Sequence, residues 1–120
     1  MLHDAEPRLD HENLDVYRCS LEFLRLSLRV VGDLPERGES ELRNQIKRAA
    51  MSIPLNIAEG AGKPTVGDRA RYHAIARGSA MECAALIDVC ALAGYLTPDD
   101  ARLAKQLLVR IVAMLTKMCR

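Results

Sequence analysis

Two interleaved apolar stripes run through one segment near the N-terminus, LDVYRCSLEFLRLSLRVV, residues 14–31. The first stripe steps by three and four residues through Leu14, Tyr17, Leu21, Leu24, Leu28 and Val31. The second stripe follows the same steps through Val16, Cys19, Phe23, Leu26 and Val30. This spacing predicts a long α-helix, because residues three and four apart share one helix face. The stripes lie on different faces, so the sequence predicts a helix that is covered from both sides.

Three further segments continue the helical pattern, which gives predicted helices at residues 13–32, 39–61, 66–93 and 98–118. The predicted N-caps are Asn13, Ser40, Thr65 and Thr97, because their side chains can accept a hydrogen bond from a free backbone amide. Gly94 is the predicted stop of the third helix. Four helices with short connections predict an all-α fold, an antiparallel up-and-down four-helix bundle.

Two residues inside these helices are unusual. Pro54 removes one backbone hydrogen bond and clashes with the preceding turn, so the fold is expected to have a Pro-kinked second helix, or a break near residues 50–54. Gly78 lies in the middle of the third helix, where glycine costs about 1 kcal/mol relative to alanine. A close backbone neighbour at Gly78 is the expected compensation.

The composition excludes several classes of protein. The chain has 120 residues, of which 49% are hydrophobic and 28% charged, so it is neither a disordered tail nor a low-complexity segment. We expect a flexible acidic arm at residues 1–12 and one bundle domain at residues 13–120. No apolar run is long enough to span a membrane, and the acidic N-terminus is unlike a signal peptide. Cys19, Cys83 and Cys90 lie on apolar lines, which predicts buried free thiols in a cytoplasmic protein. Four methionines are expected to fill the core: Met51, Met81, Met114 and Met118.

The charge is unevenly distributed although the formal net charge is only +1. Residues 43–77 carry seven basic and two acidic residues, a net +5, and residues 102–120 carry five basic residues and no acid, again +5. Two basic segments can face a polyanion, or they can be ordinary solvated helix faces. In the first case the candidate nucleic-acid contacts are Arg43, Lys47, Arg48, Arg69, Arg71, Arg102, Lys105, Arg110 and Lys117.

One stretch is too particular for generic helix design: Arg48-Ala-Ala-Met-Ser-Ile-Pro-Leu-Asn-Ile-Ala-Glu-Gly60. Together with Leu14-Asp-Val-Tyr17 and Ile75-Ala-Arg-Gly-Ser-Ala-Met-Glu82, it resembles the "four helix bundle protein" family, also known as 23S rRNA-intervening-sequence proteins. The resemblance implies a four-helix bundle that forms rings of five subunits. In a related group it implies a basic pentamer that binds nucleic acid and assists a reverse transcriptase. The expected partners are therefore a second copy of the chain, RNA or DNA, and a reverse transcriptase.

The motif also contains a polar stripe. Gln45, Arg48, Ser52, Asn56 and Glu59 fall on one side of the second helix, and Arg77, Ser79 and Glu82 on the third helix are natural partners. One interpretation is a polar network with Arg–Glu pairing that fixes helix register or a subunit interface. The other is a contact with a ligand or nucleic acid.

Catalysis and metal binding find little support. The Gly60-Ala-Gly62-Lys63 segment lacks the other residues of a phosphate-binding loop, and no Glu-x-x-His motif accompanies Glu59 and Glu82. We therefore expect no catalytic residue, no metal and no cofactor.

Two hypotheses remain for the function, a nucleic-acid-associated accessory protein and a structural scaffold for another protein. Both use a homo-oligomer, because only one stripe of the first helix can face its own core. The stripe assigned to the subunit contact is Val16, Cys19, Phe23, Leu26 and Val30.

Overall fold

A computed structural model describes residues 6–120 of the chain. A short 3-10 helix, η1 (Asp10–Asn13), precedes four long α-helices, and no β-strand occurs among the described residues. The α-helices are α1 (Asp15–Asp33), α2 (Ser40–Ala61), α3 (Val66–Leu92) and α4 (Pro98–Met118). The predicted all-α fold is confirmed, and each predicted helix is present with ends that differ by at most two residues.

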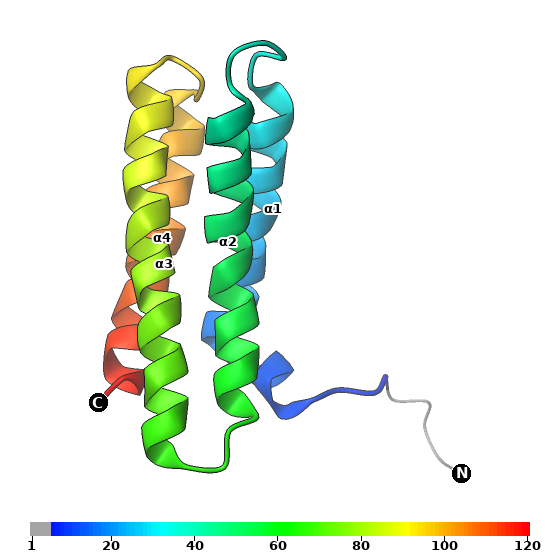
Figure 1. The fold of residues 1–120 in the computed structure, drawn as a ribbon, viewed down its shortest axis with the longest axis vertical. Helices are drawn as coiled ribbons and strands as arrows, with labels where there is room; N and C mark the ends of the chain where they lie inside the picture. The colour runs from blue at the N-terminus through cyan, green and yellow to red at the C-terminus, as the bar shows by residue number, and fades with distance from the viewer. Residues whose placement is uncertain (1–5) are drawn as a thin grey trace.

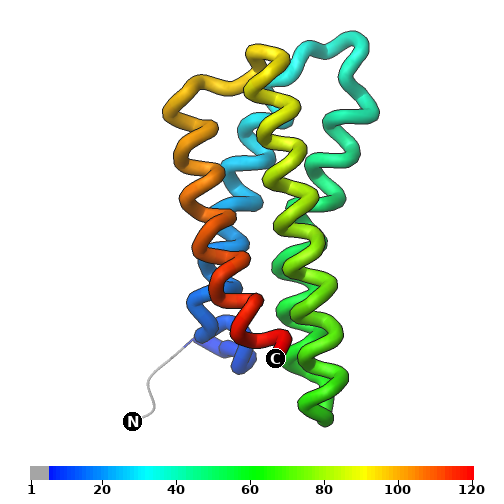
Figure 2. Tube along the Cα trace, turned by 90° about the vertical axis from the view of Figure 1, so that its left-hand side faces the viewer, coloured from blue at the N-terminus to red at the C-terminus, as the bar shows by residue number. Residues whose placement is uncertain are grey.

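The helices run side by side in alternating directions, with the loops at opposite ends (Figures 1 and 2). Packing contacts join α1 to α2, α2 to α3, α3 to α4 and α4 back to α1. Within residues 6–120 no contact joins α2 to α4 or α1 to α3. Each of these two pairs therefore occupies diagonally opposite corners of the bundle, so the outward faces of α2 and α4 point away from each other.

The stripe of α1 that was assigned to a subunit contact lies in the core of the protomer instead. Val16, Cys19, Phe23, Leu26 and Val30, which were assigned to a subunit contact, are all buried within this one protomer at 5% exposure or less. Leu21 and Leu28 of the other stripe are instead 41% and 47% exposed. Two serines, Ser20 and Ser27, are also buried on this inward side. Ser20 Oγ donates to the carbonyl of Tyr17 and Ser27 Oγ to that of Phe23, so both hydroxyls are satisfied inside the core.

Helix α2 continues through Pro54 without interruption, so the alternative of a break is wrong. Pro54 is buried and follows the inward line that also contains Ile46, Ile53 and Ile57. Proline lacks one backbone donor, and the packing of these three isoleucines against the other helices offsets that loss.

Local sequence rules locate several helix ends correctly. Thr65 Oγ1 accepts from the amide of Asp68, and Thr97 Oγ1 accepts from that of Asp100, each at 3.1 Å. Gly94 follows α3 with φ +80°, a conformation that glycine adopts easily. Asn13 and Ser40 are not caps, because Leu14 and Glu39 take those positions without any side-chain cap bond.

Two helical glycines have opposite surroundings. A Cβ added at Gly60 would lie 3.1 Å from the His73 ring and from Tyr72 Cβ, so Gly60 allows α2 and α3 to approach closely. A Cβ added at Gly78 would meet nothing within 4 Å, so the close neighbour expected there is absent from the protomer.

The cysteines agree with the prediction of free thiols. Cys19, Cys83 and Cys90 are buried and unpaired, and burial, with a smaller contribution from Glu82, raises the pKa of Cys83 to about 12. No helix among residues 6–120 has the length and apolar character that crossing a bilayer requires.

Candidate nucleic-acid interface

The polar stripe of the motif forms only in part. Ser52 Oγ on α2 lies 2.7 Å from Ser79 Oγ on α3, and Asn56 Nδ2 donates to Ser52 Oγ at 2.9 Å and to the Ser52 carbonyl at 2.8 Å. All three side chains are half-buried. This small cluster joins α2 to α3 through one side-chain hydrogen bond between the helices.

The predicted Arg–Glu pairing does not form. Arg77 Nε donates to Thr116 Oγ1 on α4 at 2.8 Å, and the nearest cation to Glu59 is Lys63 at 3.9 Å. Within residues 6–120, Arg48 and Glu82 make no hydrogen bond or ion pair. The stripe is therefore divided among three helices, and Arg48 is left as an exposed cation.

A depression on the outward side of α2 is lined by cations and by no carboxylate, although Glu41 and Glu59 are exposed toward the two ends of the same helix. A shallow depression of about 480 Å³ is lined by Asn44, Lys47, Arg48, Met51, Ser52, Leu55 and Asn56, which together are named the α2 face. Lys47, like Arg48, makes no ion pair or hydrogen bond in the described part of the chain, and none of the lining residues is acidic. Arg43, one turn away, donates to the carbonyl of Pro35 at 2.8 Å. The α2 face therefore carries two uncompensated positive charges.

Sequence reasoning did not assign the apolar part of the α2 face. Met51 is 44% and Leu55 60% exposed, whereas Met51 was expected to fill the core. Met81 on α3 is also exposed, at 51%, which contradicts the same expectation. The sequence contains a signal that could have located this apolar surface. Ile46, Ile53 and Ile57 mark the inward side of the helix, and Leu55 lies opposite to them, so its exposure follows from the helical period.

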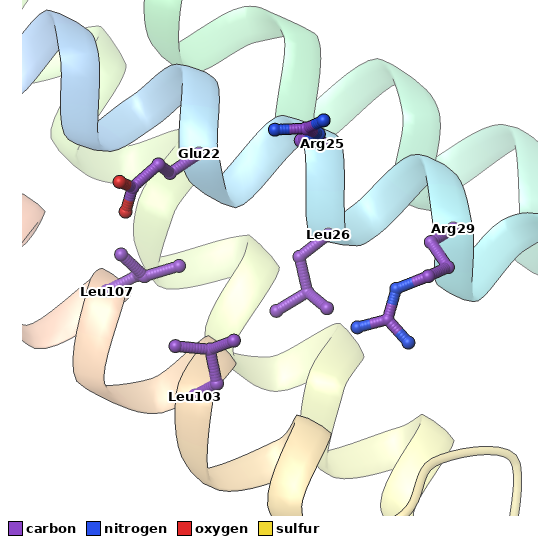
Figure 3. A pocket seen from close by; sticks show the side chains of 6 residues that line it. All are labelled: Glu22, Arg25, Leu26, Arg29, Leu103 and Leu107. Atoms are coloured by element: carbon purple, nitrogen blue, oxygen red, sulfur yellow. The ribbon is translucent and has the colours of Figure 1, made fainter.

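The outward side of α4 is different because carboxylates accompany its cations. A groove of about 420 Å³ lies between α1 and α4, where Leu26, Leu103 and Leu107 point toward one another (Figure 3). A second depression of about 620 Å³ continues it along α4. We name as the α4 face the charged residues that line the two depressions: Glu22, Arg25, Arg29, Arg102, Lys105 and Arg110.

Three of these cations are paired within the chain. Arg29 makes two hydrogen bonds to the Asp100 carboxylate, at 2.9 and 3.1 Å. Arg102 pairs with Asp99 at 3.1 Å, and Lys105 pairs with Asp88 on α3. The hydrogen bonds from Arg29 hold the pKa of Asp100 below its ordinary value. With Glu22, the five cations of the α4 face are accompanied by four carboxylates.

The remaining candidate cations lie near the ends of the helices. Arg71 and Lys63 approach the Tyr72 ring, at 4.8 and 4.9 Å from its centre. Arg69 and Lys117 have no ion pair or hydrogen bond among residues 6–120. The nine candidate contacts therefore do not form one surface, since they lie on α2, at the start of α3 and on the opposite corner α4.

No group of three His, Cys, Asp or Glu side chains among the described residues is arranged to hold a metal ion. His73 is buried, with Nδ1 3.4 Å from the carbonyl oxygen of Met118 and its ring against Gly60. Its position is that of a packing residue between α2, α3 and the end of α4.

Comparison with known proteins agrees with this fold. The profile of a family described as 23S rRNA-intervening sequence protein matches residues 12–117. A solved structure from Bacteroides thetaiotaomicron, a protein of unknown function from the S23 ribosomal protein family, superposes with a TM-score of 0.81. It is 24% identical, and the match covers 88% of this chain and 98% of that one. No curated protein matches the chain.

Proposed function

Because this chain belongs to the 23S rRNA-intervening sequence protein family, we propose that it is a non-enzymatic protein that works as a homo-oligomeric ring and binds RNA or DNA through phosphate contacts. The number of five subunits comes from the family resemblance. The two properties rest on different residues and are tested separately.

The observation that carries the assembly is the pair of apolar exteriors on opposite corners of the bundle. Leu21 and Leu28 on α1 are 41% and 47% exposed, and Met81 and Val89 on α3 are 51% and 47% exposed. Burying a large apolar side chain contributes about 1.5–3 kcal/mol. Two different apolar faces favour a head-to-tail contact, and repeated head-to-tail contacts that close give a ring.

The uncompensated cations of the α2 face support nucleic-acid binding. Lys47 and Arg48 are both exposed and free of carboxylate partners in residues 6–120. A ring repeats this pair in every subunit, which raises the local positive potential without raising the small net charge of each chain. Binding through phosphates gives affinity with little base specificity and weakens steeply as salt is added.

The assembly is tested by light scattering on the purified protein and on L21E/L28E. We expect a wild-type mass several times the 13.3 kDa of one chain, and a folded monomer for the variant, because charges at these positions do not enter its own core. K47A/R48A is the matched control and keeps the wild-type mass. A wild-type mass of 13.3 kDa would overturn the ring.

Nucleic-acid binding is tested by a mobility-shift assay with short RNA and DNA at about 50 and 200 mM salt. A shift that weakens strongly at the higher salt concentration supports the proposal. The absence of a shift at the lower concentration would refute it.

The second candidate function is a scaffold that presents the ring to another protein. The ion pairs of Arg29, Arg102 and Lys105 favour it, because carboxylates of the same chain already neutralise these basic residues. The resemblance implies a reverse transcriptase as that protein. An oligomeric mass without any nucleic-acid shift would favour the scaffold.

A further inference from the structure

We propose that the α2 face binds a single-stranded nucleic acid, and that the α4 face, although equally basic in sequence, does not. This inference rests on the proposed nucleic-acid binding and deepens it. It names the surface and the form of the ligand, neither of which follows from the net charge of the segments.

The charge balance separates the two faces. On the α2 face, Lys47 and Arg48 face solvent with no carboxylate among the lining residues. On the α4 face, a phosphate that approaches Arg29 or Arg102 meets Asp100 or Asp99 at about 3 Å from the same guanidinium. The incoming phosphate must compete with these carboxylates and is repelled by their charge. Arg25 and Arg110 have no such partner in the described part of the chain, so the net attraction, averaged over the cations of each face, is larger on the α2 face.

The apolar residues of the α2 face favour a single strand. Met51 and Leu55 lie between the polar groups of the depression, and both are substantially exposed. A duplex presents phosphates and sugars on its outside and keeps its bases stacked. A single strand exposes the flat apolar surfaces and the polar edges of its bases. Its bases can therefore lie against Met51 and Leu55 while its phosphates contact Lys47 and Arg48.

The amides add hydrogen-bonding capacity beside the apolar residues. Asn44 is exposed, with no side-chain hydrogen bond in the described part of the chain, so its amide can serve a base edge or a sugar hydroxyl. Asn56, at the other end of the depression, is already bonded to Ser52. From Asn44 to Asn56 the face spans roughly 18 Å along the helix axis at 1.5 Å per residue.

The test compares two matched double variants, K47A/R48A on the α2 face and R102A/K105A on the α4 face. Each removes two exposed cations from opposite corners of the bundle. Binding of a labelled oligo(dT), a labelled oligo(U) and a labelled DNA duplex is followed by fluorescence anisotropy at about 50 and 200 mM salt. Circular dichroism and light scattering confirm that both variants keep the fold and mass of the wild type.

We expect K47A/R48A to weaken binding by about tenfold or more at the lower salt concentration. In this variant, the slope of log K against log salt concentration becomes less steep by about 1.4 for each protomer that the strand contacts. R102A/K105A stays within about twofold of the wild type. A third variant, M51A/L55A, weakens binding of the single strand and leaves the salt dependence unchanged, because it removes apolar contacts and no charge.

The outcomes separate failure of the inference from failure of the proposed function. If the wild type binds neither oligonucleotide, nucleic-acid binding itself is wrong. If the wild type binds and K47A/R48A binds equally well, or both double variants lose the same affinity, the assignment to the α2 face is wrong. If a duplex binds as tightly as the single strand and M51A/L55A has no effect, the single-strand assignment is wrong.

Discussion

The outward faces of α2 and α4 look alike in sequence and differ in the folded protein. Residues 43–77 and residues 102–120 each carry a net charge of +5, from seven basic and two acidic residues and from five basic residues alone. In the fold, Asp88 of α3 pairs with Lys105 and Asp99 at the start of α4 pairs with Arg102, whereas Lys47 and Arg48 on α2 form no ion pair in the described part of the chain. The comparison shows that tertiary packing, rather than the charge of a segment, decides where positive potential reaches solvent.

The largest expected effect is the difference in stability between alanine substitutions on the inward and on the outward side of α2. Ile57 is fully buried, so I57A should lower the free energy of unfolding by about 2–5 kcal/mol. Leu55 is 60% exposed, so L55A should change it by about 0.5 kcal/mol or less. Chemical denaturation measures both. Similar losses in the two variants would mean that the α2 face is not free for a ligand.

A second variant tests whether the carboxylates prevent the α4 face from binding phosphates. D88N/D99N/D100N removes three negative charges that pair with Lys105, Arg102 and Arg29. We expect the affinity for a single strand to rise by several-fold at about 50 mM salt, because three cations become available to phosphates. The gain should persist when K47A/R48A is added. Unchanged affinity in the triple variant would show that the α4 face is excluded for another reason.

Alanine substitutions at the two helical glycines are expected to change stability by a smaller amount and in opposite directions. G60A places a methyl group 3.1 Å from the His73 ring and from Tyr72 Cβ, so we expect a loss of about 1 kcal/mol of stability despite the better helix propensity of alanine. G78A meets open space in the protomer and should gain up to about 1 kcal/mol.

Thermal denaturation of the two glycine variants, with light scattering as a control, tests this contrast. Stabilisation by G60A would show that His73 can give way. A G78A variant that loses its oligomeric mass would place Gly78 in a subunit contact.

The smallest effect concerns the pH dependence of the ion pair between Arg29 of α1 and Asp100 of α4. The Arg29 hydrogen bonds lower the pKa of Asp100 from 3.8 in the folded state. The pair therefore stabilises the fold fully above pH 3.8, and its contribution is lost as the pH falls from there through the lowered folded pKa. The stability difference between wild type and D100N, followed by denaturation from neutral to acidic pH, should close in that range. A difference that stays constant there would contradict this account.

Local rules account for what the sequence could predict of the fold. The caps at Thr65 and Thr97 and the stop at Gly94 depend on neighbours within three or four residues, and all three are correct. The assignment of the two α1 stripes failed because both have helical spacing, and the choice depends on packing against α4 and α2. Ser20 and Ser27 share the buried side of α1, where each hydroxyl donates to a carbonyl of the same helix.

The candidate site was likewise predictable only where it depends on residues that are close in the sequence. Lys47 and Arg48 were candidate contacts because of the charge of their segment, and Arg48 was also assigned to a polar stripe with Arg–Glu pairing that does not form. The pairing of Lys105 with Asp88 joins residues 17 positions apart on different helices, and that of Arg77 with Thr116 joins residues 39 apart. No spacing within a single helix indicates such contacts. The neutralisation of the α4 face therefore needed the structure.

The most direct test of the central claim is the response of the methionine methyl groups to a bound strand. Methyl signals remain visible in large assemblies, and the described methionines lie in different places: Met51 on the α2 face, Met81 on α3, and Met114 and Met118 beside a separate depression near the C-terminal end of α4. The protein is labelled at these methyl groups and titrated with oligo(dT), and M51L identifies the Met51 signal. The account predicts a shift of the Met51 signal while those of Met114 and Met118 stay in place. Shifts of Met114 and Met118 with Met51 unchanged would contradict it.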